Sequence, residues 1–96
     1  MAIDVAELEA RFSAVIRLAD ERLAVGASAD WEEMYRLIRT NFDGYRVALE
    51  SGGGLLANAG KGYGLGAGRA LADCGLEDDE MWTAVSRAEQ YYRGGR

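Results

Sequence analysis

The chain has 96 residues, of which 49% are hydrophobic, and its sixteen acidic and eleven basic residues give a net charge of −5. This length fits one domain with a modest core. The acidity argues against direct nucleic-acid binding, which depends on neutralising phosphates with Lys and Arg, and it favours a partner with a basic surface. The sequence has no histidine, so it lacks the most common general base and metal ligand.

The single cysteine and the first residues of the chain bear on its cellular location. Cys74 excludes an internal disulfide and a multi-cysteine zinc site, and its Ala/Leu surroundings predict a buried or half-buried thiol, with a reactive thiol as the alternative. The acidic start, MAIDVAELEARF, lacks the apolar run of a signal peptide, and no uncharged run is long enough to span a bilayer. We therefore expect a cytoplasmic protein that does not contact a membrane.

The first predicted helix covers approximately residues 4–25. Asp4 is the expected N-cap, and Glu7, three residues later, completes a capping box. Gly26 provides a stop. Apolar residues recur at spacings of three and four and therefore share one face of this helix: Val5, Leu8, Phe12, Val15, Ile16, Ala19 and Leu23.

A second helix is predicted over approximately residues 30–50, beginning at Asp30, with a β-hairpin as the competing interpretation. Asp43-Gly44 is a dipeptide that two-residue hairpin turns favour. A hairpin, however, accounts only for residues 38–49. The helical period places a longer apolar set within an arc of about 100°: Trp31, Met34, Tyr35, Ile38, Phe42, Tyr45 and Leu49. Gly44 then falls on the polar side, where it costs about 1 kcal/mol relative to alanine.

The last predicted helix covers approximately residues 77–93. Gly75 ends the preceding segment, and the four acids of residues 77–80 occupy the first turn, where the helix dipole favours negative charge. A metal site or mimicry of a phosphate row is the alternative use of these acids. The apolar stripe consists of Met81, Val85, Ala88 and Tyr92. Together, the three helices predict an all-α fold, a small bundle that forms one domain over residues 1–96.

Between these helices lies a glycine-rich segment, because eight of residues 52–68 are glycine. Residues 62–67, GYGLGA, match the G-x-G-x-x-G/A form whose amides bind pyrophosphate, but no buried strand precedes them. Lys61 is followed by glycine rather than Ser or Thr, so the Walker pattern is absent as well. We therefore predict no nucleotide or other cofactor, no metal and no catalytic residue.

Three other interpretations of the segment remain. Gly60, Gly64 and Gly68 would share one face of a tightly packed helix, although each glycine costs about 0.8–1.0 kcal/mol there. Gly52–Gly54 resembles a double-glycine export site, but the two patterned helices before it do not fit a leader. We favour an irregular segment, with a short helix near residues 55–59, a glycine loop, and a second short helix over approximately residues 67–74 that forms a weak or split fourth helix.

The glycine loop is also the predicted binding element. Residues 52–76 are the only quarter of the chain with positive charge, since Lys61 and Arg69 outnumber Asp73. We predict that residues 60–68 are mobile in the free protein and order on a partner through Lys61, Tyr63 and Arg69. Trp82 flanks the stripe of the last helix and is a further candidate anchor, with packing beneath the glycine segment as the alternative.

These features favour binding without catalysis. The size and charge of the chain are similar to those of phage and mobile-element inhibitors, anti-CRISPR proteins among them, and of toxin-neutralising immunity proteins. No motif carries this likeness. We therefore expect a non-enzymatic inhibitor of another protein or protein complex. A structural subunit that self-associates, for example as a homodimer, is the second hypothesis, and a nucleotide-binding protein or enzyme that uses GYGLGA is the third.

Overall fold

The structure is a computed structural model that describes residues 3–26, 29–62, 64–66 and 75–94, with the backbone alone at residues 29 and 30. These residues form α-helices and no strand. The all-α prediction is therefore confirmed. The described helices are α1 (Val5–Ala24), α2 (Ala29–Glu50), α3 (Gly54–Ala57) and α5 (Asp79–Gly94).

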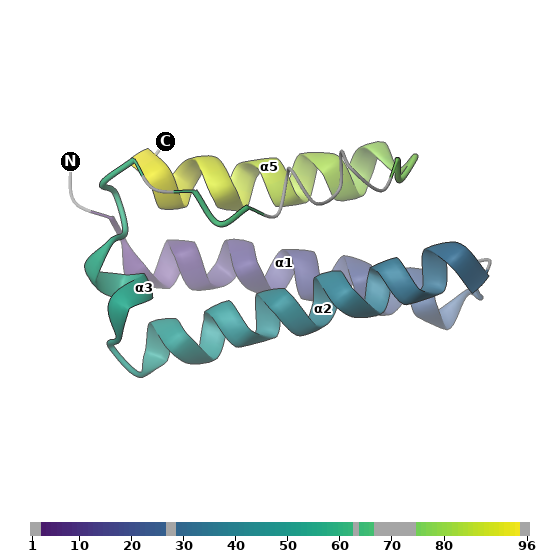
Figure 1. The fold of residues 1–96 in the computed structure, drawn as a ribbon, viewed down its shortest axis with the longest axis horizontal. Coiled ribbons are helices and arrows are strands. Elements are labelled where there is room, and N and C mark those ends of the chain that lie inside the picture. Colours follow the sequence, from purple (N-terminus) through teal and green to yellow (C-terminus); the bar gives the residue numbers. More distant parts are fainter. Residues whose placement is uncertain (1–2, 27–28, 63, 67–74, 95–96) are drawn as a thin grey trace.

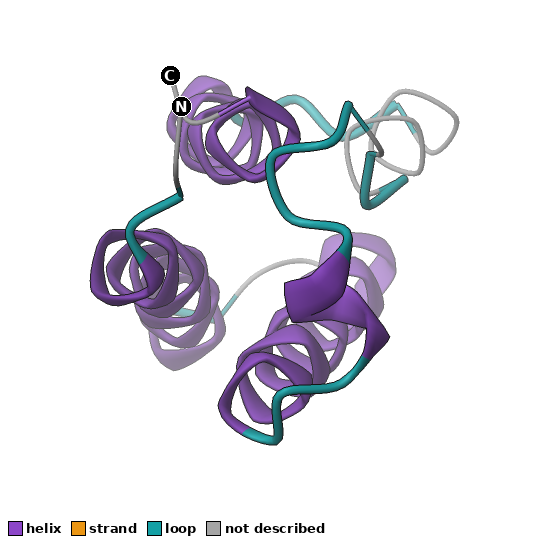
Figure 2. Cartoon of the chain, turned by 90° about the vertical axis from the view of Figure 1, so that its left-hand side faces the viewer, coloured by secondary structure: helices purple, strands orange, loops and turns teal. Residues whose placement is uncertain are grey.

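The three long helices lie side by side. Figure 1 shows α1 running antiparallel to both α2 and α5, so that α2 and α5 point in the same direction. Helix α1 packs against both of the others, and the view along the bundle in Figure 2 shows the three helices around a shared interior. Side chains from all three fill that interior. Among the described residues, no helix is both long enough and apolar enough to cross a membrane.

Helix α1 begins and ends where the sequence predicts, within one residue. The Asp4 carboxylate accepts hydrogen bonds from the N–H groups of Ala6 at 3.0 Å and Glu7 at 3.3 Å, which confirms the N-cap. The predicted apolar face is buried at Leu8, Phe12, Val15 and Ala19. Val5 is an exception, because its side chain is 40% exposed in the first turn of the helix.

Helix α2 passes through Asp43-Gly44 without interruption, so the hairpin interpretation is wrong. Gly44 lies on the exposed side, where an added Cβ would meet no atom within 4 Å. The helix persists because its apolar arc buries several large side chains against α1. Phe42 and Tyr45 form an aromatic cluster with Phe12 of α1, with ring centroids 5.1–5.9 Å apart.

Helix α5 begins at Asp79, two residues later than predicted, because Asp78 is its cap. The Asp78 carboxylate accepts a hydrogen bond from the N–H of Met81 at 3.1 Å. Glu77 therefore lies before the helix rather than in its first turn. The predicted stripe is buried throughout, and Tyr91 joins it.

Candidate binding surfaces

The glycine-rich segment is irregular in its described part. The short helix α3 ends at Ala57, earlier than the predicted residue 59, and turns follow it. Gly60, Gly62 and Gly66 have positive φ angles of 79°, 84° and 79°, a backbone conformation that a continuous right-handed helix excludes. The packed glycine helix is therefore wrong for this part of the chain. The second short helix, predicted over residues 67–74, lies outside the described residues.

The segment caps the C-terminal end of α5. The N–H of Gly60 donates to the carbonyl of Tyr92 at 2.6 Å, and the N–H of Gly62 donates to the carbonyl of Arg93 at 2.8 Å. The last carbonyls of a helix have no partner within the helix, so these bonds satisfy groups that would otherwise depend on water. Glycine suits both positions because each needs a positive φ and a close approach to another backbone.

Two amides of the GYGLGA stretch bind a carboxylate that belongs to the protein itself. The N–H groups of Leu65 and Gly66 both donate to Glu89 Oε1 of α5, each at 2.9 Å. A Cβ on Gly64 would lie 3.1 Å from the same oxygen, which explains glycine there. The backbone pattern that suggested an anion cradle thus does hold an anion, and that anion is an internal side chain.

Two tyrosine hydroxyls fix the segment between α2 and α5. Tyr92 donates to the carbonyl of Leu55 at 2.6 Å, and Tyr45 donates to the carbonyl of Leu65 at 3.3 Å. Burial raises the pKa of both tyrosines, and at Tyr45 the negative charge of Glu89 adds to the rise. The hydrogen bonds from the amides of Gly60, Gly62, Leu65 and Gly66 weigh against the predicted mobility at these residues, and we expect all four amides to exchange slowly. Mobility in the rest of residues 60–68 stays a prediction.

The first candidate surface is a basic corner formed by Lys61 and Arg93. Their backbones are brought together by the bond between Gly62 and Arg93, and both side chains are exposed. Within the described residues, neither side chain pairs with a carboxylate. A hollow of about 440 Å³ lies beside Arg93, lined by Gly62, Gln90, Arg93 and Gly94. The corner therefore offers two cations without a carboxylate partner in the described part of the chain.

The other predicted binding residues are placed differently. Tyr63 and Arg69 lie outside the described residues. Trp82 is half-buried against the core, and its indole N–H donates to the carbonyl of Leu76 at 2.9 Å. The polar group that would orient a partner is thus already used internally, and only part of the ring remains accessible. Its role as an anchor stays a prediction.

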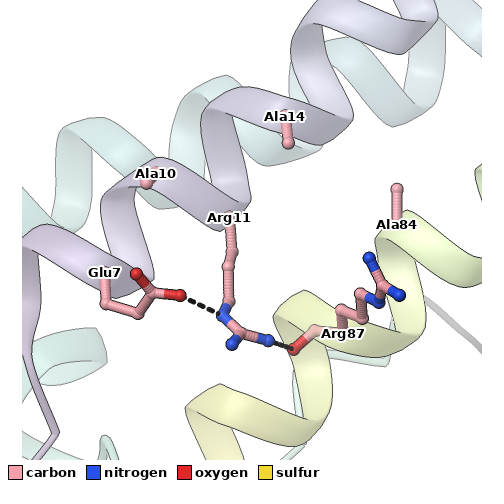
Figure 3. A pocket seen from close by; sticks show the side chains of 6 residues that line it. All are labelled: Glu7, Ala10, Arg11, Ala14, Ala84 and Arg87. Atoms are coloured by element: carbon pink, nitrogen blue, oxygen red, sulfur yellow. Dashed lines mark hydrogen bonds and ion pairs between the residues drawn. The ribbon is translucent and has the colours of Figure 1, made fainter.

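The second candidate surface is a groove between α1 and α5, which we call the α1/α5 groove. One hollow of about 350 Å³ is lined by Glu7, Ala10, Arg11, Ala14, Ala84 and Arg87, as Figure 3 shows. A second hollow of about 380 Å³ is lined by Leu18, Asp79, Glu80, Thr83, Ala84 and Arg87. The two hollows adjoin, because Ala84 and Arg87 line both of them, and we use the name α1/α5 groove for the pair.

The two arginines of this groove differ in their bonding. Arg11 is engaged: its Nε lies 2.9 Å from Glu7, its Nη1 donates to the carbonyl of Arg87 at 3.3 Å, and its guanidinium lies 4.6 Å from the centre of the Tyr91 ring. The guanidinium of Arg87 has no carboxylate partner within the described part of the chain. Among the described residues, Arg87 is thus the cation of the groove that has no carboxylate partner.

At the other end of α5, Asp78 joins three helices. Arg22 of α1 lies 2.9 Å from its Oδ2, and the hydroxyl of Tyr35 of α2 donates to the same oxygen at 2.7 Å. Burial by itself raises the pKa of Asp78, but the bonds from Arg22, Tyr35 and the Met81 amide outweigh it and hold the pKa below its ordinary value. Burial, followed by the bond to Asp78, raises the pKa of Tyr35 to about 12. Asp78, which the sequence predicts only as a charge at the helix terminus, therefore also forms an ion pair with another helix.

Sequence reasoning missed four residues that define these features: Asp78 as a tertiary partner, Arg87, Glu89 and Arg93. For Arg87 there was a usable signal, since Glu80, Ala84 and Arg87 recur at spacings of four and three. The chain matches no protein-family model, no curated protein and no solved structure. We therefore base the functional proposal on the basic corner and the α1/α5 groove.

Proposed function

We propose that this protein acts without catalysis, by binding the surface of another protein through the basic corner. The observation that carries the proposal is a pair of cations, Lys61 and Arg93, that have no carboxylate partner among the described residues. A hollow of about 440 Å³ lies beside Arg93, and the net charge of the chain is −5. A local positive site attracts an acidic group on the partner, while the acidic surface around that site is complementary to basic residues on the partner. The partner that fits is thus a protein with a small acidic patch that is surrounded by a basic surface.

The backbone of the corner supports the same proposal. Lys61 lies between Gly60 and Gly62, and both of these amides are bonded to the last turn of α5. Fixing a residue on binding costs about 1–2 kcal/mol in backbone entropy. Because the bonds already order this backbone, most of that cost is removed, and the charged side chain is presented ready to bind.

An inhibitory role belongs to the same proposal. A small protein that occupies a functional surface of its target blocks that target without chemistry of its own. The similarity in size and charge to phage inhibitors, anti-CRISPR proteins and immunity proteins favours such a role, and the cytoplasm remains the expected location. The bond between Glu89 and the GYGLGA amides weighs against a nucleotide-binding role, because the carboxylate occupies two of the donors that a phosphate would need.

A charge-reversal experiment tests the proposal. The variant Lys61→Glu/Arg93→Glu should fold normally and lose a partner captured from the cell that makes the protein. The matched control, Arg17→Glu/Arg36→Glu, changes the net charge by the same amount on exposed positions elsewhere and should retain the partner. If both variants capture the partner equally well, the basic corner is not the binding surface.

The second hypothesis, a subunit that associates with copies of itself, is favoured by a separate observation. The strip of α5 that borders the α1/α5 groove carries the acids Asp79 and Glu80 near its start and the cation Arg87 further along. A strip with opposite charges at its two ends is complementary to a reversed copy of itself.

A further inference from the structure

One side of α5 combines small residues with separated opposite charges. Glu80, Thr83, Ala84 and Arg87 follow the i, i+3, i+4, i+7 spacing and therefore lie along one side of the helix. Thr83 and Ala84 occupy its middle. At a rise of 1.5 Å per residue, the acidic and basic positions are separated by about 11 Å along the helix axis. This strip and the alanines of α1 line the α1/α5 groove.

The charges at the two ends of the strip are available. Arg87 is exposed and has no carboxylate partner in the described residues, and Asp79 is likewise exposed and without an ion pair there. Glu80 is bonded to Arg22 at 3.1 Å, but its side chain is 76% exposed, so it can accept a second cation. The groove thus presents unmatched charge of both signs.

We propose that a second copy of this chain docks in the α1/α5 groove, with the two α5 helices antiparallel about a two-fold axis between Thr83 and Ala84. In that arrangement, Arg87 of each copy faces the Asp79–Glu80 end of the other, so each attraction occurs twice. The small side chains at the crossing point allow the two helix backbones to approach closely. Ala10 and Ala14 of α1 then provide an apolar floor for side chains of the second copy.

Charge complementarity selects a second copy over an unrelated partner. A partner surface of one sign would satisfy one end of the strip and be repelled by the other end, whereas a reversed copy satisfies both. The contact does not involve Lys61 or Arg93, so it is independent of the basic corner. Stable interfaces use about 20–30 residues on each side, whereas the two hollows of the groove are lined by ten residues. We therefore expect a reversible dimer that forms as the concentration rises.

Sedimentation velocity over about 10 μM to about 1 mM tests the proposal through a charge swap. The wild-type chain should pass from monomer to dimer within this range. Arg87→Asp and Asp79→Arg should each weaken dimerisation by about tenfold or more, because each places like charges opposite one another twice. The double variant Arg87→Asp/Asp79→Arg should dimerise at least about threefold more tightly than Arg87→Asp alone, because the new acid then faces a new cation as well as Glu80 of the second copy.

Matched controls give the same charge changes outside the groove. Arg93→Asp lies on the same helix as Arg87, and Glu77→Arg lies two residues before Asp79. Both variants should dimerise like the wild type. The proposal is overturned if the wild type stays monomeric at about 1 mM, if the controls weaken the dimer as much as the groove variants do, or if the double variant fails to recover. None of these outcomes bears on partner capture by Lys61 and Arg93.

Crosslinking checks the position of the axis. In a Cys74→Ser background, Thr83→Cys places a thiol beside the proposed two-fold axis, where it should form an intermolecular disulfide under mild oxidation. Gln90→Cys places a thiol on the same helix but about 10 Å further along its axis, where its counterpart in the second copy is out of reach. Crosslinking of Gln90→Cys in preference to Thr83→Cys would contradict this arrangement.

Discussion

The carboxylate of Asp78 has several roles that its place in the sequence does not reveal. It caps α5 through the Met81 amide and also binds Arg22 and Tyr35, which belong to the other two long helices. Its side chain is only 8% exposed. Replacement by asparagine removes the negative charge while retaining the shape, so the Arg22 guanidinium loses its main partner.

We expect Asp78→Asn to lower the free energy of unfolding by about 2 kcal/mol, because hydrogen bonds to charged groups contribute more than neutral ones. Urea denaturation monitored by circular dichroism measures the change. The neighbouring exposed variant Asp79→Asn should change stability by less than about 0.5 kcal/mol. Equal losses in both variants would mean that only the helix-terminal charge of Asp78 matters.

The same residue predicts the response of the protein to acid. The pKa of Asp78 is lowered in the folded state, so its contribution to stability is complete above the unfolded-state pKa of about 3.9 and is lost as the pH falls through the lower folded-state value. The stability difference between wild type and Asp78→Asn should therefore be constant near neutral pH and shrink below about pH 4. Denaturation midpoints measured across this range test the prediction, which a constant difference down to pH 2 would contradict.

At the scale of elements, two glycines respond in opposite ways to the same substitution. Gly44 lies inside α2 with open space around it, so Gly44→Ala should stabilise the protein by about 1 kcal/mol. Gly62 has a φ of 84° and caps α5, so Gly62→Ala should destabilise it by about 1 kcal/mol. Thermal unfolding of the two variants measures both signs. A loss of stability in Gly44→Ala would contradict the continuous helix.

The glycine segment is attached to α5 in two separable ways. Glu89→Ala removes the acceptor for the amides of Leu65 and Gly66, while the bonds from Gly60 and Gly62 to backbone carbonyls stay. Amide exchange followed by NMR should therefore become faster at residues 65 and 66 and remain slow at residues 60 and 62. Gln90→Ala, next to Glu89 and exposed, should leave all four amides unchanged. Fast exchange at all four amides in the wild-type protein would instead support the prediction that residues 60–68 are mobile.

At the scale of the whole molecule, the features that could be predicted from the sequence are those that local patterns determine. The Asp4 cap, the course of α2 past Gly44 and the buried stripe of α5 follow from spacing within one helix, so they could be predicted. The contacts that hold the glycine segment could not, because their acceptors on α5 lie more than twenty residues away in the sequence. The α1/α5 groove was missed for a related reason: it needs small residues on two helices that only the fold brings together.

One contact spans nearly the whole chain. The N–H of Asp4, just before α1, donates to the hydroxyl of Tyr91 in α5 at 3.0 Å, across 87 positions of sequence. A ribosome delivers the N-terminal residues first, at about 5–20 residues per second. Helices α1 and α2 can therefore pair as soon as they emerge, but the flank of α1 that meets α5 stays uncovered until α5 is made. Helix α5, which is made after the other two long helices, thus covers a face of α1 that was exposed until then.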